Sequence, residues 1–216
     1  VNREVKDGAV IIKIKDPRQS GASKAVLVSL LCETDFVSRN SDFTTLLENL
    51  AEKAFSFGVE KMKKEVKDMV NPIIQKTGEN IQLGDTYEVS GDVLGSYVHN
   101  NKIAVIVSLI GGNVPLAKDI AMHIAAMKPE YITNTEISED TRKTMVEIFE
   151  KEIANIDKPS EIKKKILEGK LLTYFKEKTL LDQLFIKNTS ENANDTVGKL
   201  LEKNKAKIKE VKRYSI

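Results

Sequence analysis

The sequence predicts an α+β fold built on two copies of a strand-strand-helix unit. Apolar runs of strand length come in pairs that are joined by turn residues. The hexapeptide Ala25-Val-Leu-Val-Ser-Leu30 returns as Ala104-Val-Ile-Val-Ser-Leu109, and each copy follows another predicted strand and precedes an amphipathic helix. Agreement of the flanking elements as well as the hexapeptide favours an internal repeat over chance. A third observation, two long charged helical stretches after the second copy, adds a helical hairpin to the fold.

The composition is that of a soluble globular protein. Of 216 residues, 41% are hydrophobic and 31% charged, and the formal net charge of +2 does not call for a nucleic-acid partner. No apolar run approaches the roughly 20 residues of a membrane span, and a single cysteine fits a reducing compartment. The chain starts at Val1 without a signal peptide or an initiator methionine, so we expect a processed or truncated chain that lacks an N-terminal segment.

The first half of the chain should form one sheet with two helices. Alternating Ile and Lys residues predict a strand from Gly8 to Lys15, and turn residues at 16–22 lead into the buried strand at 25–30. Helices are expected at about 42–57, capped by Asp42, and at about 59–76, ended by Gly78. Two short strands, 81–85 and 87–93, should follow.

The second half begins with a hairpin that turns at Asn100-Asn101. A short Gly111-Gly112 turn then leads into a helix at about 115–127. The charged helical hairpin is expected at about 138–178, followed by a short helix capped by Thr196 and a final strand. We therefore expect an N-terminal core subdomain, 1–94, and a C-terminal core subdomain, 95–216, that includes the helical hairpin.

The polar loop at 31–43 is the feature that distinguishes the first copy from the second. Asp35 and Phe36 follow a buried strand directly, so a carboxylate and a large apolar ring would be presented together on a rigid base. That arrangement suits insertion into another molecule. The residues alone equally allow Phe36 to point into the core with Asp35 as a helix N-cap.

Catalytic chemistry is poorly supported. The chain has no Gly-rich phosphate loop, and two histidines with one cysteine give no metal-ligand spacing, so we expect neither a metal nor a cofactor. A Cys32 nucleophile with His99 or His123 is formally conceivable, but the end of an apolar strand favours a buried packing cysteine. We therefore expect a protein that is not an enzyme. By helical spacing, His123 lies on an apolar stripe, which favours a core position for it.

The loop sequence Glu33-Thr-Asp-Phe-Val-Ser-Arg-Asn40, with Phe43 after it, closely resembles the signature of the elongation factor Ts family. Members of this family are guanine-nucleotide exchange factors for elongation factor Tu. Further blocks resemble the family in the family's order: Gly91-Asp-Val-Leu-Gly-Ser-Tyr-Val-His99, Lys102-Ile-Ala-Val105, Ala117-Lys-Asp-Ile-Ala-Met-His123, Lys158-Pro-Ser-Glu-Ile162, Leu180-Leu-Asp-Gln183 and Thr196-Val-Gly198. The resemblance covers nearly the whole chain.

The resemblance implies a fold and a mode of action. The fold would be two related α+β subdomains of antiparallel sheet and helices, with an antiparallel helical hairpin, a coiled coil, projecting from the second. The chain would bind elongation factor Tu in its GDP-bound and nucleotide-free states and promote GDP release by inserting the Asp35-Phe36 loop into the partner's nucleotide-binding domain. The complex would be 1:1 or 2:2, in the cytoplasm and without direct nucleic-acid or membrane contact. The partner-binding residues implied by residue match are Thr34, Asp35, Phe36, Val37, Arg39, Ile103, Ala104 and His123, so the resemblance favours an interface role for His123 over the core position.

The sequence departs from the family pattern in three ways. The family's small N-terminal helical domain is absent, Ala104 replaces a usual glycine, and Leu184 replaces a usual proline. A different function class also stays open, namely an RNA- or ribosome-associated binding protein that uses the Lys-rich hairpin and tail. A steep salt dependence of RNA affinity would favour that class.

Overall fold

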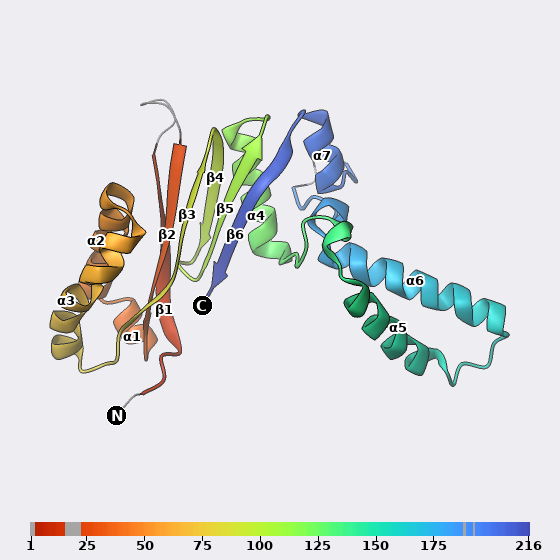
Figure 1. Cartoon of the computed structure of the whole chain (residues 1–216), viewed down its shortest axis with the longest axis horizontal. Coiled ribbons are helices and arrows are strands. Elements are labelled where there is room, and N and C mark those ends of the chain that lie inside the picture. Colours follow the sequence, from red (N-terminus) through yellow and green to blue (C-terminus); the bar gives the residue numbers. More distant parts are fainter. Residues whose placement is uncertain (1–2, 16–22, 188, 192) are drawn as a thin grey trace. The chain divides into compact units, whose positions relative to one another are not determined.

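The computed structural model describes residues 3–15, 23–187, 189–191 and 193–216, and the predicted α+β fold class is confirmed. It contains two three-stranded antiparallel sheets together with helices (Figure 1). The turn expected at 16–22 lies outside the described residues. The chain divides into two compact units, one formed by residues 1–126 and 205–216 and the other by residues 127–204.

The first sheet has the strand order β1-β2-β3, with β1 at Asp7–Ile14, β2 at Ser23–Cys32 and β3 at Gln82–Gly91. Its middle strand is the first copy of the repeat, and the side chains of 25–30 are all buried. Successive side chains of a strand point to opposite faces. Val26, Val28 and Leu30 therefore pack beneath the helices, whereas Ala25 and Leu27 face the second sheet.

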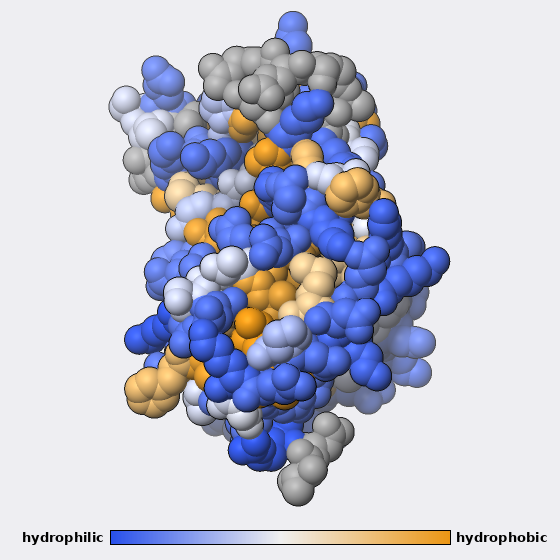
Figure 2. Space-filling model, turned by 90° about the vertical axis from the view of Figure 1, so that its left-hand side faces the viewer, coloured by the Kyte–Doolittle hydropathy of each residue, from blue (hydrophilic) through white to orange (hydrophobic). Residues whose placement is uncertain are grey.

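Two helices cover the outer face of this sheet. These are α2 (Ser41–Phe57) and α3 (Val59–Thr77). From Phe43 to Ala54, α2 buries apolar residues that recur with helical spacing, whereas Phe57 at its end is exposed. Gly78 ends α3 in the left-handed conformation, at φ 72°, as the sequence predicts. The predicted cap of α2 is wrong by two residues, because Asn40 is the N-cap and its side chain accepts a hydrogen bond from the Asp42 amide. Figure 2 shows this side of the molecule, where hydrophilic residues surround the hydrophobic ones.

The second sheet has the order β4-β5-β6, with β4 at Val93–His99, β5 at Ile103–Ile110 and β6 at Lys207–Ser215. The expected hairpin turn is confirmed, since Asn100 and Asn101 have φ values of 50° and 56°. The helix α4 (Val114–Met127) covers the outer face. A Cβ on Gly95 of β4 would lie 2.3 Å from the Ala117 carbonyl carbon, so glycine is what permits this close approach.

The two sheets pack face to face through one buried cluster. Val10, Ala25 and Leu27 of the first sheet meet Leu94, Ala104 and Ile106 of the second. The first unit is therefore layered as α2–α3, first sheet, second sheet and α4 (Figure 1). Both copies of the repeated hexapeptide are the central strands of their sheets, and corresponding positions face the opposite sheet.

One strand prediction is wrong. The sequence predicts two strands, at 81–85 and 87–93, but the single strand β3 runs from Gln82 to Gly91, and Val93 already begins β4. The register shifts between Val28 and Leu30 of β2, which pair with Thr86 and Leu83. The turn-type residues Gly84 and Asp85 are absorbed into this irregularity, and the Ser29 hydroxyl donates to the Asp85 carbonyl at 2.7 Å. The strand therefore continues where the sequence indicates a break.

The second unit contains the expected pair of charged helices, α5 (Glu139–Ile153) and α6 (Ser160–Lys178). The rings of Phe149 and Tyr174 lie 5.6 Å apart, and Lys170 pairs with Glu152 at 2.8 Å. Going back along α5 from Glu152 to Phe149 corresponds to going forward along α6 from Lys170 to Tyr174, so the helices run antiparallel. That they form a coiled coil, or project from a subdomain, stays a prediction.

Shorter elements complete the second unit. They are η2 (Asn134–Glu136), η3 (Leu180–Asp182) and α7 (Val197–Lys203). Thr196 caps α7 as predicted, because its side chain accepts from the Lys199 amide. Within the described ranges, each helix is too short or too polar to span a bilayer.

The expected subdomain boundary between residues 94 and 95 lies inside β4. Both sheets fall in the first compact unit, and the helical pair falls in the second. The compact units are divided at other residues than the predicted subdomains 1–94 and 95–216. The predicted subdomains concern related parts of the chain, and this division remains a prediction.

Candidate functional site

The turn between β2 and α2 presents an exposed phenyl ring on a short helix. Residues expected to form a loop instead include α1 (Asp35–Ser38), a single helical turn. The Phe36 side chain is 85% exposed, the most exposed large hydrophobic residue within the described part of the chain. The alternative in which Phe36 points into the core is therefore wrong, and Asp35 is the first helical residue rather than the cap.

The opposite side of α1 is fixed to the core. Val37 belongs to the cluster beneath α2, and Ser38 is buried too. The Ser38 amide donates to the Thr34 carbonyl at 3.2 Å, and the buried Cys32 thiol donates to the same oxygen at 3.2 Å. Asp35 and Arg39 pair across the exposed side at 3.4 Å. Phe36 thus stands on a base that its neighbours hold in place.

A carboxylate from the end of α3 holds the N-terminal end of this turn. Glu79 accepts hydrogen bonds from the Glu33 amide at 3.0 Å, the Thr34 amide at 3.1 Å and the Thr34 hydroxyl at 2.6 Å. In return, the Glu33 carboxylate accepts from the Asn80 amide at 2.7 Å and pairs with Arg3 at 3.3 Å. Residues 33–34 before α1 and residues 79–80 after α3 are therefore joined by hydrogen bonds in both directions.

A lysine from the second sheet meets the other end of the turn. Lys102 Nζ donates to Asp7 Oδ1 at 2.6 Å and the Gly8 carbonyl at 2.5 Å, and it lies 3.5 Å from Ser38 Oγ. Burial of the Asp7 carboxyl opposes its ionisation, but hydrogen bonds from Lys102, Ser38 and Gly8 together hold its pKa below the usual value. This contact brings the β4–β5 turn to the same end of the first unit as α1.

Cys32 is not a reactive nucleophile. Burial, with the nearby negative charges of Asp7 and Glu79, raises the pKa of its thiol to about 12. The thiolate is the reactive form of cysteine, so this thiol is protonated and inert at neutral pH.

The other residues expected to bind a partner are not all brought to this surface. Ile103 is partly exposed and follows Lys102 directly, at the same end of the unit as α1. Ala104 is completely buried between the sheets, and His123 is completely buried on α4. In this state neither side chain is available for direct contact.

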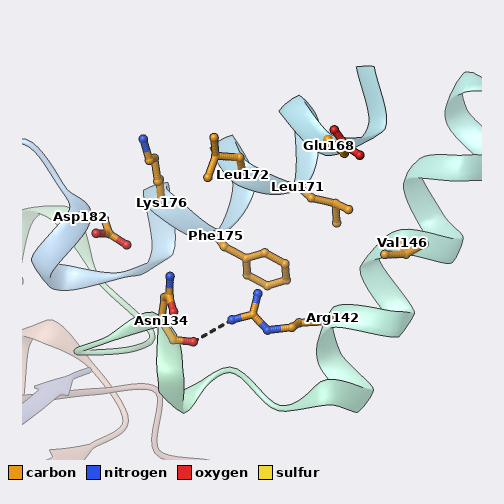
Figure 3. Close-up of a pocket in the computed structure, with 9 residues that line it drawn as sticks. All are labelled: Asn134, Arg142, Val146, Glu168, Leu171, Leu172, Phe175, Lys176 and Asp182. Carbon is orange, nitrogen blue, oxygen red and sulfur yellow. Dashed lines mark hydrogen bonds between the residues drawn. The ribbon is translucent and has the colours of Figure 1, made fainter. Parts of the chain in front are cut away.

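A hollow of about 480 Å³ in the second unit is a different candidate (Figure 3). The Arg142 guanidinium lies 5.3 Å from the centre of the Phe175 ring and donates to the Asn134 carbonyl at 2.8 Å. Its described lining mixes two cations and two carboxylates with apolar residues: Asn134, Arg142, Val146, Glu168, Leu171, Leu172, Phe175, Lys176 and Asp182. None of these is a predicted site residue, and this mixture of charges selects no ligand.

Comparisons with known proteins identify the family of this chain. A family model described as Elongation factor TS matches residues 33–216. The chain belongs to the elongation factor Ts family. It is 36% identical to an elongation factor Ts of Hahella chejuensis, over 97% of this chain and 72% of the relative. It is 35% identical to that of Deinococcus deserti, over all of this chain and 81% of the relative.

Membership of the elongation factor Ts family makes the chain a translation elongation factor.

The sequence analysis did not identify Glu79 or Lys102 as residues that support the turn. Glu79 follows the glycine that ends α3, which is a recognisable signal for a chain reversal. Nothing local to Glu79 indicates which backbone amides its carboxylate will reach.

Proposed function

We propose that this chain promotes the release of GDP from elongation factor Tu, and that the turn carrying Asp35 and Phe36 inserts into the partner's nucleotide-binding domain. One observation carries the proposal: a phenyl ring that is 85% exposed on a helical turn bonded at both ends. Family membership supports the choice of partner. The turn needs no rearrangement to present the ring.

Exchange requires only differential binding. The chain must bind the nucleotide-free partner more tightly than the GDP-bound one, and by linkage it weakens GDP binding by the same factor. Burying one phenyl side chain contributes roughly 1.5–3 kcal/mol. A tenfold change in affinity corresponds to about 1.4 kcal/mol, so Phe36 could supply a tenfold or larger share of the coupling if its burial requires GDP to leave.

The neighbours of Phe36 have separate parts in this proposal. Asp35 and Arg39 pair at the surface and can exchange that contact for one with the partner, whereas Val37 acts by anchoring the turn. Thr34 holds the backbone through Glu79, and Ile103 adds an apolar contact beside the turn. Contacts from Ala104 and His123 stay predictions that require β5 or α4 to move.

The chain acts in this proposal by binding and not by catalysis, in the cytoplasm, where its partner works. It engages the partner in both the GDP-bound and the nucleotide-free state. Measuring the mass of the complex in solution distinguishes a 1:1 from a 2:2 stoichiometry.

The test is the release of a fluorescent GDP analogue from purified elongation factor Tu, with and without the chain. Phe36→Ala should slow the accelerated release at least about tenfold. Phe57→Ala is the matched control, because Phe57 is also exposed, at 64%, but lies at the far end of α2. Both variants should keep the wild-type melting temperature, since surface substitutions change stability by about 0.5 kcal/mol or less.

Wild-type release rates in Phe36→Ala would refute the insertion of this ring while leaving exchange itself standing. If the wild-type chain neither accelerates release nor binds the partner, the exchange function fails. The RNA-associated class would then be tested by measuring RNA affinity against salt concentration.

A further inference from the structure

We propose that Glu79 is the positioning residue of the turn between β2 and α2. It holds α1 in the orientation from which Phe36 engages the partner. This inference rests on the proposed function. It goes beyond it by assigning a role to a residue 43 positions after Phe36, at the end of a different helix. The assignment starts from three hydrogen bonds that converge on one carboxylate.

The helical turn α1 cannot hold itself. It has four residues, and isolated helices shorter than about 12 residues are marginal in water. Its N-cap residue, Thr34, makes no side-chain cap, and the Thr34 hydroxyl donates to Glu79 Oε1. The amides of Glu33 and Thr34 donate to the other oxygen, Glu79 Oε2. The carboxylate thus fixes the backbone just before the helix begins.

The position of Glu79 follows from the end of α3. Gly78 takes the left-handed conformation, and its amide closes the helix on the Ile74 carbonyl at 2.8 Å. The chain then reverses, which points Glu79 back at the strand β2. The reciprocal bond from the Asn80 amide to Glu33 keeps the two segments in register.

The bonds are of the strong kind. Hydrogen bonds to an ionised carboxylate are roughly twice as strong as those between neutral groups. Replacing Glu79 by glutamine keeps the size of the side chain but removes its charge and one of the two accepting oxygens. Glutamine can keep all three contacts only if its oxygen accepts from both amides and its NH2 group donates to the Thr34 hydroxyl. Every bond is then a weaker neutral one, and the turn gains the freedom to tilt. A tilted α1 delivers the Phe36 ring to the wrong place even though the ring is still present.

A positioning role differs from a merely structural one in its dependence on Phe36. If Glu79 acts through the ring, then removing the ring removes the effect of Glu79. If Glu79 only stabilises the fold, the two substitutions act independently. A double-mutant cycle separates these cases.

The experiment measures the rate of GDP-analogue release from elongation factor Tu as a function of the concentration of the chain. Glu79→Gln should lower the maximal rate between about tenfold and a hundredfold, the scale of a misplacement of about 1 Å. The concentration at half-maximal rate should change less than about twofold, because the rest of the binding surface is intact. In the Phe36→Ala background, Glu79→Gln should have no further effect.

Two other variants refine the test. Glu60→Gln removes a carboxylate from the opposite end of α3, where its side chain is 85% exposed, and it should behave as wild type. Thr34→Val removes the hydroxyl that donates to Glu79 and should lower the rate. Thermal melting of each variant identifies any that fail to fold.

A wild-type maximal rate in Glu79→Gln would overturn the proposal, as would a full additional loss in the Phe36→Ala background.

A second experiment does not need the partner at all. Hydrogen exchange at the Glu33 and Thr34 amides should be faster in Glu79→Gln than in the wild-type chain. If the wild-type chain does not accelerate GDP release, the proposed function fails, and unchanged protection of these two amides overturns the positioning of the turn as well.

Discussion

Two strands of nearly the same sequence lie at the centres of the two sheets, yet they lead into different turns. β2 continues into the turn that presents Phe36. β5 ends at Ile110 and is followed by Gly111 and Gly112, which have φ values of 74° and 71° and lead within two residues into α4. Both strands have an irregular register at the same serine, opposite β3 in one sheet and opposite β6 in the other. The two strands occupy equivalent places in their sheets, and the structural difference between the copies lies in the turns at their ends.

This comparison predicts that equivalent core positions matter equally for folding. Leu27 and Ile106 occupy corresponding places in the repeat, and both are completely buried between the sheets. Leu27→Ala and Ile106→Ala should each lower the free energy of unfolding by about 2–5 kcal/mol. Urea denaturation measures both values. A loss confined to one of them would mean that the two copies do not contribute equally to the core.

The second turn should be intolerant of side chains. A Cβ on Gly111 would lie 2.3 Å from the Lys205 carbonyl oxygen, at a backbone conformation that disfavours other residues. Gly111→Ala should therefore cost roughly 1–2 kcal/mol for the conformation and about 1–3 kcal/mol for the overpacking. Gly78→Ala is the control, because its φ is similar but nothing lies within 4 Å of the added Cβ. Equal losses in the two variants would show that the close contact contributes nothing.

The two serines should respond differently to removal of the hydroxyl. Ser29 Oγ donates to the Asp85 carbonyl at 2.7 Å, whereas Ser108 Oγ is buried without a hydrogen-bond partner among the described residues. Ser29→Ala should lower the free energy of unfolding by about 1 kcal/mol, and Ser108→Ala should be neutral or stabilising. Chemical denaturation of the two variants decides this, and a larger loss from Ser108→Ala would contradict it.

The smallest expected effect concerns the ion pair that joins β1 to the β4–β5 turn. The pKa of Asp7 is lowered in the folded chain, so its contribution to stability is complete above the unfolded value, near 3.8, and is lost as the pH falls through the folded value. Asp7→Asn should therefore be less stable than wild type at neutral pH, and the gap should close below about pH 4. Unfolding curves at several pH values measure the gap. A gap that persists in strong acid would assign the effect to packing.

Local patterns predicted most of the fold and part of the site. The Asn100-Asn101 turn and the end of α3 at Gly78 were predictable because their residue types favour positive φ. The continuity of β3 was not, because it depends on a bulge opposite Ser29 in another strand. The sequence identified Phe36 as a candidate but left its direction open, since that is decided by the burial of Val37 on the other side of α1.

The supports of the turn lay beyond local reasoning. Glu79 reaches Thr34 across 45 positions, and Lys102 reaches Asp7 across 95. Such contacts depend on how distant segments close together, and no pattern within either segment records them.

The buried thiol beneath the turn gives the molecule a built-in probe of opening. Cys32 is completely buried, and its sulfur contacts the Thr34 carbonyl, so a thiol reagent can reach it only when the β2–α1 junction separates from the core. The labelling rate then reports the free energy of that local opening without any added reporter group. With the partner bound, the same rate would tell whether the turn tightens or loosens as the nucleotide leaves.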